Sequence, residues 1–369
     1  MDRISDARFM RRALSLASRG GAVASPNPMV GSVVVKGGEI VGEGWHKGPG
    51  TSHAEVVALR AAASKARRSV VFVTLEPCTH QGRTPPCVDA LIAAKPSRVV
   101  IAMQDVDARV AGKGIKALEK AGIDTYVGVC EEEAGRLNES YVMHRLHDRP
   151  FVTLKAAITL DGRTAAKDSS SRWITGPTAR KDVHRLRNSH DAICVGVGTV
   201  IADDPSLTVR DVRLKGRQPL RVVIDPTGRV PRTASVLSAD APTLVVTSTD
   251  ISGASVNKIE KAGAEVLSLA GNRGSIDIAS LLETLAQRDI MSLMLEGGAA
   301  TAARFEEQGF IDKYVFYVAP KLLGGPGTRG LFEGWAASNI ADAKRLQISS
   351  VKRLGEDIKI VAYPARVAD

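Results

Sequence analysis

The feature that most constrains the fold is an alternation of short apolar segments with helical stretches, which continues along nearly the whole chain. In the first half, strands are predicted at residues 30–36, 39–45 and 70–76, with a helix at 54–66 between the last two. Gly37 and Gly38 suit a two-residue hairpin turn, because glycine readily adopts a positive φ. A hairpin followed by a β-α-β unit is typical of an α/β fold.

The alternation then extends to the C-terminal half. Helices are predicted at 86–94 and 115–121, strands at 98–103 and 123–129, and one charged helix at 131–149. Pro150 separates that helix from a second set of strands. The second set is predicted at residues 151–158, 192–196, 220–224, 243–247, 264–268, 292–296 and 313–318, with helices between several of them.

Length and composition set the domain organisation. The chain has 369 residues, more than one hydrophobic core usually supports, so we expect two domains at residues 1–147 and 148–369. No run of about 20 uncharged apolar residues predicts a membrane span, and the first 20 residues indicate a helix of the fold rather than a secretory signal. The four scattered cysteines favour a reducing compartment, so we expect a cytoplasmic protein.

The net charge of +10 raises the question of nucleic acid binding, because basic patches attract phosphate backbones. Only 4% of the residues are aromatic, so side chains on which bases could stack are scarce. The composition favours a protein that handles small phosphorylated molecules and binds no nucleic acid.

Four residues with metal and proton chemistry lie at predicted junctions between strands and helices: His53, Glu55, Cys78 and Cys87. One histidine and two cysteines suit zinc and leave its fourth position to water, whose pKa zinc lowers toward about 7. Glu55 is then the predicted catalytic residue, since it can move protons without binding the metal. H-x-E followed by P-C and a second cysteine is the signature of zinc nucleobase deaminases, although eight residues separate the cysteines here instead of two.

The run PCTHQGRTPPC at residues 77–87, which follows H-A-E at 53–55, closely resembles the bifunctional riboflavin-biosynthesis deaminase/reductase family. Asn27 in PNPMVG, His46 in GWH and Asp105 also match this family. The resemblance implies a cytidine-deaminase-like αβα domain in which these three residues contact a phosphorylated pyrimidine. The sequence departs from the family pattern at Asp107, where an asparagine is usual.

Runs such as LKAA at 154–157, LDGR at 160–163 and EGG at 296–298 resemble the reductase half of the same family. That half looks like dihydrofolate reductase in its α/β fold and uses NADPH. The implied cofactor contacts are Ala157, Trp173, Thr199, Asp203, Gly298, Ala299, Ala300, Thr301, Ala302, Ala303 and Arg304. The implied substrate contacts are Lys155, Ser171, Arg187, Leu207, Arg210 and Glu296.

Without the resemblance, the residues of the second half leave two readings open at each of two places. Gly297 and Gly298 follow an apolar strand and open a helix, whose free N–H groups could bind a diphosphate, but such a pair also makes an ordinary turn. Residues 163–221 hold twelve lysines and arginines against six acids, which suits phosphate binding or a solvated helix face.

The resemblance implies two consecutive reactions. Zinc hydroxide would remove the 2-amino group of 2,5-diamino-6-(5-phosphoribosylamino)pyrimidin-4-one, and NADPH would then reduce the ribosyl group to ribityl. It also implies a homo-oligomer. Three rivals stay open: a polynucleotide deaminase, a binding module in which zinc only holds the fold, and a chain in which one half is inactive. The sequence does not assign the proton donor of the reduction or the preference between NADPH and NADH.

Overall fold

The computed structural model describes residues 3–82, 84–271 and 275–365. The chain divides into two compact units, and the division falls between Arg149 and Pro150. None of the helices in the described ranges combines the length and the apolar character needed to cross a bilayer.

The described residues of the first unit form a five-stranded sheet in the order β2-β1-β3-β4-β5. Strand β1 is antiparallel to β2 and β3, whereas β3, β4 and β5 run parallel. Lys36 pairs with Glu39, which confirms the predicted hairpin. The elements are α1 Arg3–Ala17, η1 Gly21–Val23, β1 Gly31–Lys36, β2 Glu39–Trp45, α2 Ala54–Ala62, η2 Ala63–Ala66, β3 Val70–Val73, α3 Cys87–Ala94, β4 Arg98–Ile101, α4 Lys113–Lys120, β5 Asp124–Val127, α5 Glu131–Leu137 and α6 Glu139–His147.

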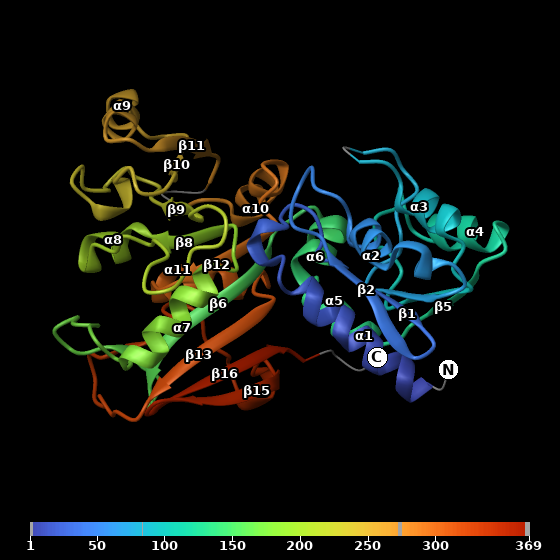
Figure 1. Ribbon diagram of the computed structural model, residues 1–369. Helices are drawn as coiled ribbons and strands as arrows, with labels where there is room; N and C mark the ends of the chain where they lie inside the picture. The colour runs from blue at the N-terminus through green and yellow to red at the C-terminus, as the bar shows by residue number, and fades with distance from the viewer. Residues whose placement is uncertain (1–2, 83, 272–274, 366–369) are drawn as a thin grey trace. The chain divides into compact units, whose positions relative to one another are not determined.

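Helices cover both faces of this sheet, as an αβα arrangement requires (Figure 1). Alternate strand residues point to opposite faces, so Val34 packs with Leu59 of α2 and Leu91 of α3 in one cluster. On the other face, Phe9 of α1 lies against Phe72 of β3, with ring centroids 5.4 Å apart.

Two helix predictions in this unit were wrong in extent. The helix predicted at 131–149 is two helices, α5 and α6, separated at Asn138. The Asn138 side chain binds the backbone of Met29, which is distant in the sequence. Its amide nitrogen donates to the Met29 carbonyl at 3.0 Å, and its oxygen accepts from the Met29 N–H at 2.8 Å. The helix predicted to reach residue 66 ends at Ala62, because Ala63 has a φ of 48°.

The described residues of the second unit form a nine-stranded sheet in the order β11-β10-β9-β8-β12-β6-β13-β16-β15. The strands from β11 to β13 in this order are parallel, and β16 and β15 are antiparallel additions at one edge. A short ladder joins β7 and β14. The elements are β6 Phe151–Thr159, β7 Arg163–Ala165, α7 Pro177–Arg187, β8 Ala192–Gly196, α8 Val197–Asp203, β9 Leu220–Ile224, η3 Ser235–Leu237, β10 Thr243–Ser248, α9 Gly253–Lys261, β11 Glu265–Leu269, α10 Ile278–Gln287, β12 Ser292–Glu296, α11 Ala299–Glu307, β13 Lys313–Ala319, β14 Arg329–Gly330, η4 Ile340–Asp342, β15 Leu346–Leu354 and β16 Asp357–Pro364.

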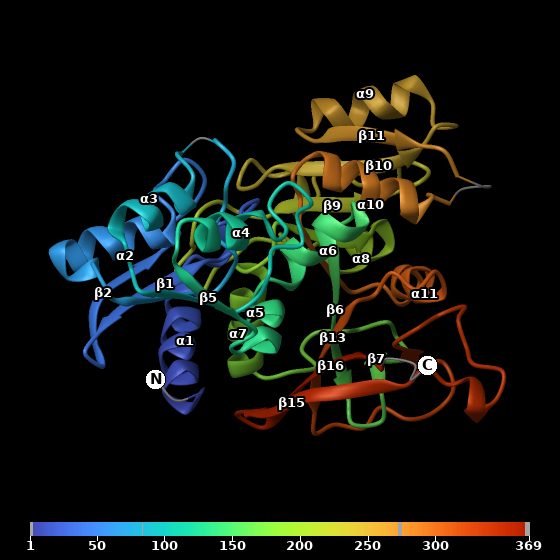
Figure 2. The ribbon, with the colours of Figure 1, turned by 90° about the vertical axis from the view of Figure 1, so that its right-hand side faces the viewer.

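This second sheet is also a middle layer (Figure 2). On one face, Cys194 of β8 packs in a cluster with Leu281 of α10 and Phe305 of α11. On the other face, Val195 packs with Val200 of α8 and Ile259 of α9. The parallel order places the carboxyl ends of β8, β12 and β6 side by side, which is where open α/β sheets bind their ligands.

Candidate active sites

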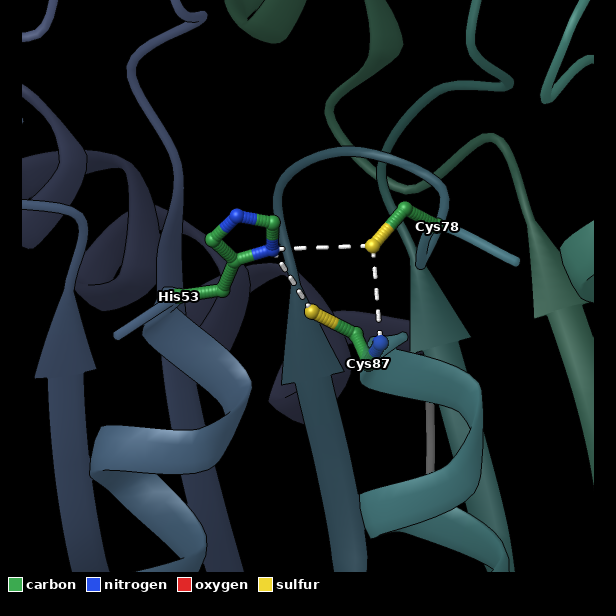
Figure 3. A group of neighbouring side chains, drawn as sticks. All are labelled: His53, Cys78 and Cys87. Carbon is green, nitrogen blue, oxygen red and sulfur yellow. Dashed lines mark hydrogen bonds between the residues drawn. The ribbon is translucent and has the colours of Figure 1, made fainter. Parts of the chain in front are cut away.

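The structure brings three predicted metal ligands of the first unit together (Figure 3). The ligand atoms of His53, Cys78 and Cys87 all lie within 4.8 Å of one another. His53 Nδ1 is 2.9 Å from Cys87 Sγ and 3.5 Å from Cys78 Sγ. An imidazole nitrogen and two sulfurs that converge in this way fit zinc, which binds such donors tetrahedrally.

Each ligand sits where the local fold fixes its backbone. His53 is the N-cap of α2, and Cys87 is the first residue of α3. Helix α2 lies directly on β2, since a Cβ at Gly44 would be only 2.3 Å from the Ala54 carbonyl oxygen. Thr84 Oγ1 lies 3.2 Å from His53 Nε2, which leaves Nδ1 facing the two sulfurs.

The two thiols lie beside each other, and each changes the ionisation of the other. Hydrogen bonding from Cys87 and from His53 outweighs burial and lowers the pKa of Cys78 to about 4, whereas its neighbouring thiolate and burial raise the pKa of Cys87. The backbone N–H of Cys87 also donates to Cys78 Sγ at 3.4 Å. The site therefore stabilises a thiolate, the form in which cysteine binds a metal.

Glu55 lies in the first turn of α2 and is only 3% exposed. Burial raises its pKa to about 7, although a cation held by the neighbouring ligands would lower it again. The neighbouring Cys87 thiol lowers the pKa of this carboxyl group and partly offsets the effect of burial. A buried carboxyl group beside the metal ligands, able to hold or release a proton near neutral pH, suits general acid and base work.

The structure also brings together Asn27 and His46, which the sequence analysis expected at the substrate. Asn27 Nδ2 is 2.9 Å from His46 Nε2, and the His46 ring lies edge-on to His53, with centroids 5.2 Å apart. Burial lowers the pKa of His46, so its ring is neutral at pH 7. Asn138 holds this segment through Met29, a contact between residues 109 apart that no local sequence signal shows.

Glu76 was missed by the sequence analysis, yet it organises the loop beside Cys78. Its buried carboxylate accepts the backbone N–H groups of Asp105 at 3.2 Å, Gly112 at 2.9 Å and Gly114 at 2.9 Å. It therefore ties the strand that leads to Cys78 to the loop that carries Asp105. The signal was an acid buried at the end of an apolar strand, directly before Pro77.

We predict that Glu76→Ala lowers the free energy of unfolding of the first unit by about 3 kcal/mol, because several backbone donors lose their buried acceptor. Urea unfolding followed by tryptophan fluorescence measures this change when Trp173 and Trp335 are replaced by phenylalanine in every protein compared, because Trp45 is then the one tryptophan left. Exposed Glu39→Ala is the matched control and should change stability by less than about 0.5 kcal/mol. Equal values for the two variants would show that Glu76 does not hold the loop.

Asp105 and Asp107 belong to one ordered hydrogen-bond network, and Asp107 is the position at which the sequence departs from the family pattern. Asp105 Oδ1 accepts from Tyr141 Oη at 3.0 Å and from the Asp107 N–H at 2.9 Å. Asp107 binds the Arg109 guanidinium through both oxygens, and Arg145 Nε lies 3.7 Å from it. Arg109 lowers the pKa of Asp107 to about 2, so the additional negative charge is compensated within the same loop.

The second unit contains a cleft of about 1170 Å³ at the carboxyl ends of its parallel strands. Its lining includes all six implied substrate contacts and every implied cofactor contact except Ala303. Ala303 is 3% exposed and belongs to the buried side of α11. Residues separated by more than 140 positions thus meet in one cleft.

The centre of the cleft holds an ion network around Glu296. Arg187 donates to Glu296 from Nε at 2.9 Å and from an NH2 group at 2.8 Å, and Lys155 Nζ donates at 3.3 Å. Burial opposes ionisation of Glu296, but the charges of Arg187 and Lys155 outweigh it and hold its pKa well below the usual range. Arg187 also donates to the Thr208 carbonyl at 2.9 Å, which fixes the segment between Leu207 and Arg210.

The walls of the cleft carry the other predicted contacts. Ser171 Oγ donates to Asp203 Oδ1 at 2.8 Å, so these two residues from distant segments are fixed together. Trp173 is 60% exposed, and the Arg180 guanidinium lies 4.6 Å from its ring centroid. Gly297 and Gly298 both have positive φ, and α11 begins at Ala299, so the predicted glycine turn before a helix is confirmed.

Several lining residues were not predicted, among them Arg180, His184 and Arg229. His184 Nδ1 accepts the backbone N–H of Arg210 at 3.3 Å, and burial lowers its pKa. The excess of basic residues over residues 163–221 was the available signal for Arg180, but it did not separate the residues of the cleft from those of a solvated face. Arg229 lies beyond that stretch.

Comparisons with known proteins agree with both halves of this description. The family model "Cytidine and deoxycytidylate deaminase zinc-binding region" matches residues 3–103, and "RibD C-terminal domain" matches residues 150–360. The riboflavin biosynthesis protein RibD of Aquifex aeolicus is 44% identical over 98% of this chain and 99% of its own length. The RibD protein of Escherichia coli is 40% identical over 96% and 98%.

Solved structures give the same result. RibD of Acinetobacter baumannii (form 1) superposes with a TM-score of 0.88 at 38% identity, covering 99% of this chain and all of that one. A Thermotoga maritima protein, described as a diaminohydroxyphosphoribosylaminopyrimidine deaminase/5-amino-6-(5-phosphoribosylamino)uracil reductase, gives 0.87 at 33% identity over 98% and 99%.

The fold and the two sites thus define a two-unit enzyme with a zinc-deaminase-type unit followed by a reductase-type unit. The chain belongs to the RibD family of bifunctional deaminase/reductase enzymes of riboflavin biosynthesis.

Proposed function

We propose that the first unit, residues 1–147 of the sequence analysis, hydrolyses the 2-amino group of 2,5-diamino-6-(5-phosphoribosylamino)pyrimidin-4-one. The observation that carries this proposal is the convergence of His53, Cys78 and Cys87 beside buried Glu55. Bound by these three residues, zinc supplies a water of lowered pKa at neutral pH. Glu55 takes the proton of the attacking water on its carboxylate and delivers it to the departing ammonia.

Asn27 and His46 are proposed to bind the pyrimidine beside that site. The neutral His46 ring and the Asn27 amide offer hydrogen bonds without adding charge, which suits an uncharged ring. Asp105 is proposed as a further substrate contact. Tyr141 and the Asp107 N–H both bind its Oδ1 and so fix the position of its carboxyl group.

We propose that the second unit, residues 148–369 in the sequence analysis, reduces the ribosyl group of the deaminated product with NADPH. The cofactor supplies the hydride, and the protein's part is to align donor and acceptor and to exclude water. Gly298 to Arg304 are proposed to hold the diphosphate, with Ala157, Trp173, Thr199 and Asp203 near the nicotinamide. The free N–H groups at the start of α11 support that placement.

The substrate of this second step is proposed to lie against Lys155, Ser171, Arg187, Leu207, Arg210 and Glu296. Because Glu296 neutralises much of the charge of Lys155 and Arg187, Arg210 is the cation of this set best placed to attract the substrate phosphate. We further propose a cytoplasmic enzyme that acts on small molecules, without a nucleic acid or membrane partner, and that forms a homo-oligomer.

A turnover assay on the metal-analysed protein tests the proposal. We expect ammonia release from the diaminopyrimidine without cofactor, and NADPH oxidation only after deamination. Stripping zinc with a chelator should abolish ammonia release and leave NADPH oxidation on the deaminated product intact. No ammonia from the zinc-loaded protein would refute the assigned substrate, and tight, salt-dependent binding to single-stranded nucleic acid would favour the polynucleotide rival.

A further inference from the structure

Helix α7 binds the segment 206–211, which forms one edge of the cleft of the second unit. His184 and Arg187 of α7 are three residues apart, so they lie on the same face of the helix. His184 Nδ1 accepts the backbone N–H of Arg210 at 3.3 Å, and Arg187 donates to the Thr208 carbonyl at 2.9 Å. Both side chains are buried, so water does not compete for these bonds. The helix therefore fixes the backbone of the segment at two points.

Gln218, which lies two residues before the start of β9, binds the residue between these two points. Its Oε1 accepts the Val209 N–H at 2.7 Å, and its Nε2 donates to the Val209 carbonyl at 3.0 Å. An amide side chain that makes both bonds does the work of a neighbouring strand, because it satisfies the donor and the acceptor of one residue together. Bonds at three successive residues thus hold the segment in one backbone conformation.

The backbone at both ends of the segment needs this support. Leu207 has a φ of 50° and Asp211 has a φ of 60°, in the left-handed region that residues with a Cβ rarely adopt. Such a conformation persists only where the surrounding contacts enforce it, and it is typical of ligand sites. The contacts of His184 and Gln218 therefore hold a strained segment at the edge of the cleft.

His184 also contacts the acid that follows Arg210 in the sequence. Because its Nδ1 accepts an N–H, the proton of the neutral ring is on Nε2, which lies 3.5 Å from Asp211 Oδ2. Burial lowers the pKa of His184, which favours this neutral form at pH 7. A carboxylate beside Arg210 would repel an incoming phosphate, and the contact holds that of Asp211 against α7.

The Arg210 guanidinium stays available for an anion. Its hydrogen bonds are to two hydroxyl groups, Ser206 Oγ and, at 3.5 Å, Thr208 Oγ1. In the part of the chain that the structure describes, no carboxylate forms an ion pair with it. Neutral partners orient the group without cancelling its charge, so it can still bind a phosphate.

An arginine binds phosphate with two parallel hydrogen bonds only when its planar group has the correct direction, which depends on where its backbone lies. The backbone of Arg210 is set by His184, and that of the residue before it by Gln218. We propose that His184 and Gln218 are positioning residues of the reductase, which place Arg210 where it binds the substrate phosphate. The inference rests on the proposed reductase function.

Steady-state kinetics of the reduction test the inference. In His184→Leu and in Gln218→Ala, we expect the KM for the deaminated product to rise about 5- to 10-fold, the value of lost neutral hydrogen bonds. The kcat and the KM for NADPH should stay within about twofold, because only substrate binding is weakened. His184→Asn keeps an acceptor at the position of Nδ1 and should restore most of the KM. Lys181→Leu, exposed on the same helix and outside the cleft lining, is the matched control and should change neither constant.

A double-mutant cycle with Arg210→Gln shows whether the two residues act through Arg210. Arg210→Gln alone should raise the KM for the deaminated product about 10- to 100-fold, the value of a charge-assisted hydrogen bond. Adding His184→Leu or Gln218→Ala should then raise it by less than about twofold, since the group that they position is already gone. Additive effects would overturn the inference, and so would an unchanged KM in the single variants.

The melting temperature and the ammonia release of the first unit separate the remaining outcomes. If kcat and both KM values worsen together as the melting temperature falls, the two residues only support the fold and the inference is wrong. If the unmodified protein releases ammonia but does not reduce the deaminated product, the proposed reductase function fails and the inference falls with it. Normal reduction with an unchanged KM in His184→Leu would overturn the inference alone.

Discussion

Glu55→Gln should reduce the rate of ammonia release by a factor of about 10² to 10⁴, the usual contribution of a positioned acid or base. Glutamine has nearly the same shape but cannot take a proton from water or return one to the leaving amine. Because Glu55 is not among the three converging ligands, the zinc content should stay at one ion per chain. NADPH oxidation on the deaminated product should be unchanged, since Glu55 lies in the other unit.

Three values measured on one preparation decide what Glu55 does: the zinc content, the rate of ammonia release and the rate of NADPH oxidation. Exposed Glu39→Gln in the same unit is the matched control and should leave all three values unchanged. If the variant loses both its zinc and its ammonia release, Glu55 supports the metal site and its role as proton carrier is not needed to explain the loss. Retention of more than a tenth of the rate with full zinc would exclude Glu55 as the proton carrier.

Sequence reasoning reached the metal ligands because each lies at a junction with a local signal. His53 and Cys87 begin helices, and Cys78 follows a buried strand. Strands β2 and β3 both run antiparallel to β1, so the carboxyl ends that precede these ligands lie at the same edge of the sheet. The α/β class and most strands of the second unit were also predictable from local sequence. Their apolar runs are buried on both faces of the sheet.

What the sequence did not show depends on contacts between distant residues or on the geometry of exposed elements. The break at Asn138 follows from its bonds to Met29, and no pattern within residues 131–149 indicates it. Strands β15 and β16 were missed because they add to the sheet at an exposed edge, where most of β15 is polar or solvated. Likewise, Arg229 differs from its basic neighbours only in where its turn places it.

Arg187→Met should lower the free energy of unfolding of the second unit by about 3–5 kcal/mol, because it leaves Glu296 buried with only Lys155 as a cationic partner. The side chains of Arg187 and Glu296 are 9% and 12% exposed, so water cannot replace the lost partner. Reduction should also be lost, since the Thr208 segment loses its anchor. Arg185→Met on the same helix is the matched control, because Arg185 is 62% exposed and makes only a 3.9 Å contact with Asp182.

Two further measurements show that the effect belongs to the ion pair. Adding Glu296→Gln to Arg187→Met should recover part of the loss, with a coupling energy above about 1 kcal/mol in the double-mutant cycle. The depressed pKa of Glu296 stabilises the unmodified fold above the unfolded pKa of about 4.3, and this contribution is lost as the pH falls through the folded value. In Arg187→Met, the loss of the Arg187 charge moves the pKa of Glu296 upward from its value in the unmodified protein, so acid relieves part of the penalty. The stability gap between the two proteins should therefore narrow below about pH 5, and a gap that is constant with pH would mean that lost packing, not charge, destabilises the variant.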